Sequence, residues 1–413
     1  MVKYKTSEDF IPSISNQGFV KYDIPNRRLS PSNNVKFNGS IIRHKGEILL
    51  AYRRYDPEHG RTSIAITKLD ENFEPKSHHR CNLDSRFNKP VQEDCRLFHY
   101  LGNLYISWTD LDWEGWKFYG KARISQMYSH LVFDGDEYHS YKSLMPDYGG
   151  NHNEVEKNWT FFDHRRELYF VYNINNHEIV SPDWSTGSIQ ESRKSEDLIY
   201  YPYGHIRGGS PPVYSERFVG YLSFFHGSTK NAWLGRRYYM GAIVIDPDRL
   251  KISFISKSPI IYGTSQEPFC GAGNGRCVFP MGHYWDEKRE SYVVSCGIND
   301  TFNSIIMIKP EDIEKDMVSS NRFLEPDIRY FRITGRKAGY RSLEGLSTNW
   351  KIVKNSGIEG ESYVAEVVDP FAIQDLRKNK DAVEISKDEY RSWIKPTQKK
   401  QERGKHFFKK VFD

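Results

Sequence analysis

The sequence predicts an all-β protein, a five-bladed β-propeller with a short C-terminal helical extension. Aromatic residues make up 15% of the chain, with 27 Tyr and 9 Trp, a level that suits strands better than helices. A pattern of turn, apolar run and polar residue also recurs roughly every 50–70 residues, which is the range of propeller blades. Because this spacing is irregular, a two-sheet β-sandwich is the alternative fold.

The recurring pattern occurs five times and predicts where a site would form. The apolar runs cover residues 46–52, 102–108, 166–172, 219–225 and 290–296. The polar residues that follow them are Arg53, Asp110 with Asp112, Asn173, His226 and Asp300. Equivalent strands of propeller blades lie around one axis. We therefore expect these side chains to meet in one central funnel, although they are far apart in the sequence.

Along the chain we expect a lead segment over 1–30, a propeller catalytic domain over 31–370 and a C-terminal helix with a basic tail over 371–413. Residues 310–317 predict a short helix with acids in its first turn. A terminal helix is predicted around 385–393, where Ser386 is a suitable N-cap and Glu389 would complete a capping box. The basic tail is interpreted as solubilising, with weak contact to an anionic surface as the alternative.

Composition and charge limit the classes of protein, cofactor and partner that we expect. No apolar run is long enough to cross a bilayer, and the N-terminus lacks the apolar core of a signal peptide, so we expect a cytoplasmic chain. The five cysteines are scattered without a CxxC pair, which favours neither a zinc site nor a disulfide framework. We expect no metal and no cofactor. The net charge of +5 comes without a basic-aromatic recognition motif, so no nucleic acid partner is expected.

The stretch 93–116 points most directly to chemistry. It ends in two acids, Asp110 and Asp112, set among the indoles of Trp108, Trp113 and Trp116. Aromatic faces pack on the apolar faces of a pyranose, while carboxyl groups handle hydroxyls and protons. These residues predict a sugar-binding catalytic cleft. The alternative is an ordinary turn with solvated acids beside core tryptophans.

Several stretches, in order over roughly residues 30–310, together resemble glycoside hydrolase family 130. This family contains five-bladed mannoside phosphorylases and β-mannosidases, with mannosyltransferase relatives of the same fold. The matching stretches are VKFNGS (35–40) with LAYR (50–53), EDCR (93–96), ISWTDLD (106–112), EKNW (156–159), RGGSPP (207–212), FHG (225–227), YMGA (239–242) and CGINDT (296–301).

The resemblance implies roles for particular residues. The proton donor would be Asp112, with Asp110 as the fallback. Together with the polar strand ends, it gives a set of substrate-binding candidates: Asn38, Arg53, Asp94, Lys157, Asn158, Trp159, His205, Arg207, His226, Tyr239 and Asp300. Structural alternatives exist for several of them, namely a salt-bridge cluster around Asp94, a core position for Trp159 and an ordinary turn for Asp300.

Three positions depart from the family pattern. Cys95 stands where the family has proline, and His205 where it has lysine. Asn173 stands where the resemblance implies an arginine that helps to hold inorganic phosphate. Phosphate binding depends on fixed positive charge, which asparagine does not supply. His205 and Arg207 are the candidates for a replacement charge.

We therefore expect a carbohydrate-active enzyme, a glycosyltransferase or glycoside hydrolase that makes or breaks a β-mannosidic bond. Its substrates would be an oligosaccharide, a sugar nucleotide or a sugar phosphate. The alternatives are a phosphate-dependent mannoside phosphorylase, a non-catalytic glycan-binding propeller and a protein-interaction propeller. The glycine-rich stretch 271–276 lacks the flanking strand and helix of a dinucleotide loop, so we interpret it as a rim loop.

Overall fold

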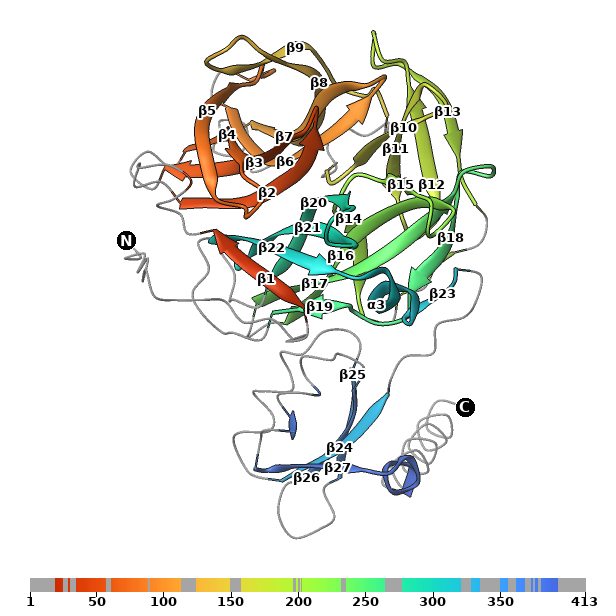
Figure 1. The fold of residues 1–413 in the computed structure, drawn as a ribbon. Coiled ribbons are helices and arrows are strands. Elements are labelled where there is room, and N and C mark those ends of the chain that lie inside the picture. Colours follow the sequence, from red (N-terminus) through yellow and green to blue (C-terminus); the bar gives the residue numbers. More distant parts are fainter. Residues whose placement is uncertain are drawn as a thin grey trace. The chain divides into compact units, whose positions relative to one another are not determined.

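The computed structural model is built almost entirely of strands, which confirms the all-β prediction (Figure 1). It describes residues 19–24, 29, 35–56, 61–87, 90–112, 124–148, 157–195, 198–199, 201, 203–231, 235–263, 277–320, 328–334, 350–355, 362–367, 373, 376–377 and 380–392. The chain divides into two compact units. The first comprises Met1–Tyr200, Ile206–Gly227 and Tyr238–Phe323, and the second comprises Tyr201–His205, Ser228–Arg237 and Leu324–Asp413.

The largest sheet has eight strands and combines two consecutive antiparallel groups of four. The first group is β2 (Val35–His44), β3 (Glu47–Asp56), β4 (Arg61–Leu69) and β5 (Pro75–Asn82). The second group is β6 (Pro90–Tyr100), β7 (Asn103–Asp112), β8 (Ile124–Phe133) and β9 (Tyr138–Leu144). The two groups form one sheet because β5 pairs in parallel with β9. The described sheets therefore do not separate into the five blades that the sequence predicted.

Three further sheets follow along the chain. One is antiparallel and contains β10 (Thr160–His164), β11 (Glu167–Asn173), β12 (Glu178–Pro182) and β13 (Ile189–Arg193). The next has seven strands, β14 (His205–Gly208), β15 (Val213–Ser215), β16 (Gly220–Asn231), β17 (Gly235–Asp246), β18 (Lys251–Ser256), β19 (Ile261–Tyr262) and β23 (Met317–Ser319). The third contains β20 (Val278–Asp286), β21 (Ser291–Ile298), β22 (Phe302–Ile308) and β1 (Val20–Ile24).

The N-terminal strand β1 completes the last of these sheets by pairing with β22. The segment that was expected to lead into the fold thus contains an edge strand of this sheet. It pairs an N-terminal strand of the first unit with a strand near the C-terminal end of the same unit. The short helix α3 (Pro310–Glu314) follows β22, with Glu311 and Asp312 in its first turn as predicted. Among the described residues, no helix is long and apolar enough to cross a membrane.

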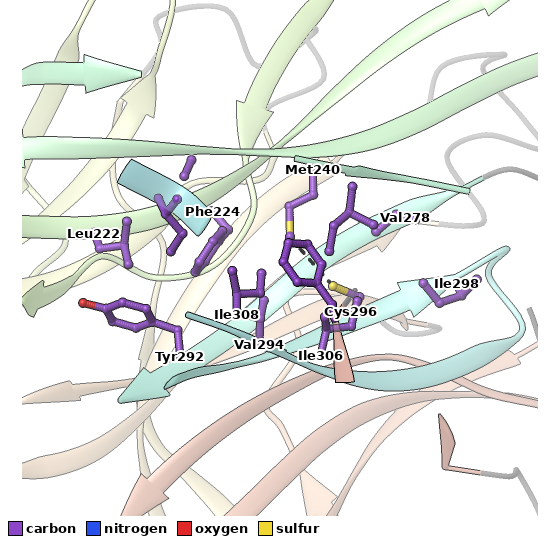
Figure 2. Close-up of a cluster of buried hydrophobic side chains, with 14 of the residues drawn as sticks. Leu222, Phe224, Met240, Val278, Tyr292, Val294, Cys296, Ile298, Ile306 and Ile308 are labelled. Atoms are coloured by element: carbon purple, nitrogen blue, oxygen red, sulfur yellow. Dashed lines mark hydrogen bonds between the residues drawn. The ribbon is translucent and has the colours of Figure 1, made fainter. Parts of the chain in front are cut away.

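The apolar runs recognised in the sequence form β3, β7, β11, β16 and β21, and they build the core. In Figure 2, alternate residues of β21 (Tyr292, Val294, Cys296 and Ile298) lie in one cluster with Phe224. The residue between two of them, Val293, lies in a different cluster. Both faces of β21 are therefore buried, which explains why its sequence is an almost continuous apolar run. Each fully buried side chain of this kind contributes roughly 1.5–3 kcal/mol.

The first strands of the groups lie close to one another. Strand β2 contacts both β6 and β20, and β6 contacts β10 and β20. Gly282 on β20 shows how close these strands are, because a Cβ there would lie 2.5 Å from the backbone nitrogen of Ile41 on β2. Strands from distant parts of the sequence are thus brought together, and their polar residues meet.

The second unit contains its own four-stranded sheet, β24 (Arg329–Thr334), β25 (Trp350–Asn355), β26 (Ser362–Val367) and β27 (Ala382–Ile385). The expected boundary at residue 370 falls inside this unit, whose longest segment is Leu324–Asp413. Strands β24, β25 and β26 lie within the range 31–370 that was expected to form the propeller domain, but they pair with one another, and β24 pairs with β27. Phe331 and Tyr330 on β24 belong to two small apolar clusters within this unit.

The predicted terminal helix is present over residues 387–392. Its N-cap is the predicted one, because the Glu389 backbone N–H donates to Ser386 Oγ at 3.1 Å. The Glu389 carboxylate accepts a hydrogen bond from Arg332 at 3.0 Å. That bond ties the helix to β24 within the second unit.

Candidate active site

Two β-bulges aim the polar side chains of the candidate site. Asn38 lies where the pairing of β2 with β3 shifts between Phe37 and Ser40, and Asp94 lies where the pairing of β6 with β7 shifts. Both residues have positive φ angles, 51° and 49°. Asn and Asp tolerate this left-handed conformation better than other residues with side chains. A bulge redirects a side chain out of the regular alternation, which is how these two come to face each other.

A buried amide links two carboxyl groups at the centre of the site. Asn38 Nδ2 donates to Asp94 Oδ1 and to Asp300 Oδ1, at 3.1 Å in each case. Asn38 and Asp94 are buried, and Asp300 is partly buried in the turn after β21. Three groups of strands each supply one of these residues. Of the strand-end residues that the sequence analysis expected to meet, Asp300 belongs to this trio, whereas Asn38 and Asp94 were separate substrate-binding candidates.

Burial and a neighbouring carboxylate make Asp300 unusually easy to protonate. Loss of hydration is the main cause and the charge of Asp94 adds to it, while Arg53 and the Asn38 amide act in the opposite direction. Together they raise the pKa of Asp300 to about 6. A carboxyl group with this pKa can hold or release a proton close to neutral pH.

Arg53 lies beside this acid pair. Its Nη2 is 2.5 Å from Glu93 Oε1, and its guanidinium lies over the ring of Phe37 at 5.0 Å from the centroid. Both charged side chains are less than one-fifth exposed. The ion pair and the ring fix the direction of the guanidinium, so that Arg53 is held rigidly near the carboxyl groups.

Arg96 is completely buried and connects three groups of strands. Its Nε donates to the Gly209 carbonyl at 2.5 Å, its Nη1 to the Asp94 carbonyl at 2.9 Å and its Nη2 to Asn158 Oδ1 at 3.0 Å. Loss of hydration lowers the pKa of Arg96 to about 10. It therefore remains charged at neutral pH and supplies a fixed positive field under the site.

His226 contacts the same Gly208–Gly209 backbone as Arg96. Its Nδ1 is 2.9 Å from the Gly208 carbonyl, and its ring is 4.3 Å from that of Phe279. Burial, followed by the charges of Arg96 and Arg207, holds the pKa of His226 well below its usual range. The imidazole is therefore neutral, with Nδ1–H donated to the carbonyl and the lone pair on Nε2.

Lys157 and Arg207 add positive charge to the same region. Both are half-buried, and both lower the pKa of His226. Asn158, next to Lys157, has a φ of 69° and donates its backbone N–H to Gln126 at 3.1 Å. The left-handed turn at Asn158 places its side chain on Arg96. Four of the predicted site residues, Lys157, Asn158, Arg207 and His226, are thus assembled around this buried arginine.

Other predicted site residues lie elsewhere. Trp159 is 3% exposed and stacks on Phe170 at 4.8 Å with an interplanar angle of 13°. Its indole is therefore part of the core and offers no open face to a sugar. Tyr239 is also fully buried, with its ring against Gly227. His205 is exposed and belongs to the second unit.

The predicted acids of β7 have different surroundings from the acid pair. The carboxylate of Asp110 is fully buried and accepts hydrogen bonds from Ser85 Oγ at 2.8 Å and the Arg86 backbone at 3.1 Å. It holds a loop. The Asp112 backbone pairs with Pro90, but its side chain lies outside the described part of the chain. Trp113 and Trp116 also lie outside it, whereas Trp108 is a core residue.

Asn173, the residue that argued against phosphate binding, has a local role. Its Oδ1 accepts the backbone N–H of Asn175 at 2.9 Å and closes the turn after β11. It supplies no charge to the candidate site.

Sequence reasoning missed three contributions to the site. Glu93 and Arg96 were interpreted as a structural salt-bridge cluster, yet they orient Arg53 and Asp94. The backbone carbonyls of Gly208 and Gly209 also went unrecognised. Consecutive glycines were the available signal, because a Cβ at Gly209 would lie 2.4 Å from the Phe224 carbonyl oxygen. Among the described residues, no three His, Cys, Asp or Glu side chains are grouped to hold a metal.

Comparison with solved structures places this geometry in a known fold. β-1,2-Mannobiose phosphorylase from Listeria innocua matches at a TM-score of 0.50, with 16% identity over 72% of this chain and 98% of that one. An inferred glycoside hydrolase from Parabacteroides distasonis matches at 0.52, with 13% identity over 75% and 98% of the two chains. The chain has a glycoside hydrolase family 130-like fold.

A glycosyl hydrolase from Bacteroides ovatus gives a similar match, with a TM-score of 0.50 and 13% identity over 67% of this chain and 85% of that one. At identities this low the likeness concerns the fold. No protein-family model and no curated protein matches the sequence.

Proposed function

We propose that this protein is a carbohydrate-active enzyme that makes or breaks a glycosidic bond, with a mannoside as substrate. The carrying observation is the assembly of Asn38, Asp94, Asp300 and Arg53 from three groups of strands, with Arg96 and His226 beside them. Carboxylates, amides and guanidinium groups that converge in this way suit the hydroxyls of a sugar ring. The family 130-like fold and the mannobiose phosphorylase of that fold support a mannoside.

A five-bladed propeller is the arrangement we propose for the first unit. Support comes from its consecutive groups of antiparallel strands and from the contacts of β2 with β6 and β20. In such a propeller, the pairing of β1 with β22 would close the ring of blades, because it joins strands from the N-terminal and C-terminal parts of one domain. In this arrangement the catalytic domain ends near Phe323, and the second unit is an appendage.

The chemistry needs a carboxyl group that gives a proton to the glycosidic oxygen and later takes one back. Asp112 is the acid that the sequence predicts, with Asp110 as the fallback. The described side chains favour the pair of Asp94 and Asp300 as the competing assignment, because Asp300 binds a proton near neutrality beside Asn38 and Arg53. The same acid would serve both hydrolysis and glycosyl transfer. The reaction is hydrolysis where water accepts the sugar, and transfer where another hydroxyl group accepts it.

Phosphorolysis is the second candidate, and specific residues favour it. Lys157 and Arg207 are half-buried cations near His226. Fixed cations of this kind bind phosphate or a sugar phosphate. They could replace the charge that Asn173 does not provide.

The test is a donor screen with purified protein. β-Mannosides, mannose 1-phosphate and GDP-mannose would be offered with and without inorganic phosphate, and the release or transfer of sugar measured. Turnover of a β-mannoside without phosphate supports hydrolysis or transfer, whereas turnover only with phosphate supports phosphorolysis. An absence of both turnover and sugar binding would refute the proposal.

The acid is identified by matched variants in the same assay. Asp94→Asn, Asp300→Asn and Asp112→Asn would be compared with Asp134→Asn, a substitution of an exposed acid in the β8–β9 turn. The variant that loses at least about a hundredfold in kcat carries the acid. We expect Asp134→Asn to retain wild-type turnover.

A further inference from the structure

The amide of Asn38 has an unusual set of neighbours. Its Nδ2 donates to two carboxylates, while its Oδ1 is buried with no hydrogen-bond partner among the described residues. An unpaired buried oxygen costs free energy, so the two hydrogen bonds that the nitrogen donates must maintain this orientation of the amide. Turning the amide over would direct Oδ1 at two carboxylates and leave them without a donor.

Gly297 makes room for this arrangement. A Cβ built on Gly297 would lie 1.8 Å from Asn38 Oδ1 and 3.0 Å from its Cα. Gly297 pairs with Phe279 and Asn303 in the middle of its sheet, so its backbone cannot easily move away. Any side chain at 297 would therefore displace the Asn38 amide.

The three linked residues also share an uncommon backbone conformation. Asn38, Asp94 and Asp300 all have positive φ angles, of 51°, 49° and 45°. Non-glycine residues in this region are held there by surrounding structure and concentrate at functional sites. Three such residues joined by one amide indicate a built arrangement.

The charged and titratable groups that face Asp300 are Asp94, Arg53, Glu93 and the buried thiol of Cys277. Two of these are the carboxylates of Asp94 and Glu93, and their negative charge raises the pKa of Asp300. The Asn38 amide and Arg53 act in the other direction, because they stabilise the ionised form. The pKa of Asp300 therefore depends on where the amide is held.

We infer that Asn38 is a positioning residue: its amide holds the carboxyl groups of Asp94 and Asp300 in place as one pair, and Gly297 is required to keep the amide in position. The inference rests on the proposed function for its purpose, since a well-positioned pair of carboxyl groups near a bound sugar serves acid–base chemistry. Its test does not depend on turnover.

The experiment is an infrared titration of protonated carboxyl groups in the full-length resting protein between pH 4 and 8. The band of Asp300 is identified by its loss in Asp300→Asn. Asn38→Gly removes the amide and keeps the positive φ accessible, and Gly297→Ala leaves Asn38 in place but displaces its amide. We expect both variants to raise the titration midpoint of Asp300 by about one pH unit, because the ionised form loses its donor.

Two control variants make equivalent changes in the same unit. Asn303→Ala removes a buried amide that accepts from the Gly39 backbone N–H and donates to the Lys36 carbonyl, on either side of Asn38, and so it shows whether loosening the β2 backbone alone moves the titration. Gly241→Ala introduces a Cβ that would lie 2.2 Å from the ring of Phe225. Both should leave the Asp300 titration at its wild-type midpoint.

The outcomes separate the inference from the proposed function. An unchanged midpoint in both Asn38→Gly and Gly297→Ala would overturn the positioning role, even if those variants lost activity. An equal shift in Asn303→Ala and Gly241→Ala would overturn it as well, because the effect would then be general loosening. In an active enzyme, the pH limb of kcat should move with the infrared midpoint. A protein that turned over no glycoside would refute the proposed function and leave the titration to decide on the acid pair.

Discussion

Replacing Asp300 with asparagine should stabilise the protein at alkaline pH. Burial and Asp94 raise the pKa of Asp300 from 3.8 to about 6, so the folded state binds a proton more tightly than the unfolded state. A raised pKa contributes stability that is complete below the unfolded value of 3.8 and is lost as the pH rises through about 6. The difference of about 2 pH units corresponds to at most about 3 kcal/mol, and less because Asp300 is partly exposed.

Asp300→Asn has no proton to lose and keeps an oxygen that can accept from Asn38. Its free energy of unfolding relative to wild type should therefore increase between pH 4.5 and 8, by about 1–3 kcal/mol. Urea denaturation at a series of pH values measures this difference. A difference that stays constant across the range would refute the reasoning.

Asp134 provides a control of opposite sign. Hydrogen bonds from the backbone of Glu137 and Asp136 hold its pKa down at about 2. A lowered pKa contributes stability that is present above 3.8 and is lost only as the pH falls towards 2. The effect of Asp134→Asn should consequently be constant between pH 5 and 8.

Two further predictions concern the residues around the acid pair. Arg96→Lys should lower the free energy of unfolding by about 3 kcal/mol or more, because a lysine cannot satisfy the Gly209 and Asp94 carbonyls and the Asn158 amide together. Denaturation at pH 7 measures this loss of stability, and a loss below about 1 kcal/mol would contradict the prediction. Trp159→Ala should cost about 3–5 kcal/mol as a core cavity, with KM for a sugar substrate unchanged; an increase in KM without loss of stability would instead indicate direct contact with the sugar.

The strands were predictable because their patterns are local. The run before Asp300 alternates between two buried clusters, and the apolar side chains of β21 occupy both. Sequence alone could not show that β24 pairs with β26 and β27 in a separate sheet instead of joining the first unit. That distinction depends on pairing between segments, which leaves no mark on either segment alone.

The site was only partly predictable for a similar reason. Asp300 and Arg53 follow apolar runs, and this position was a usable signal. Asn38 and Asp94 reach the site through β-bulges, and a bulge cannot be located without its partner strand. Trp159 has the composition of a sugar platform, but whether its indole faces solvent or core is decided by the strand on which it packs.

Turnover of a β-mannoside by the wild-type protein and by Asp94→Asn and Asp300→Asn, each with and without inorganic phosphate, tests the central claim most directly. The account predicts turnover in the wild type that does not require phosphate and that falls at least about a hundredfold when the acid pair is altered. Wild-type turnover that persists in both variants would contradict the claim that this carboxyl pair is the centre of the active site.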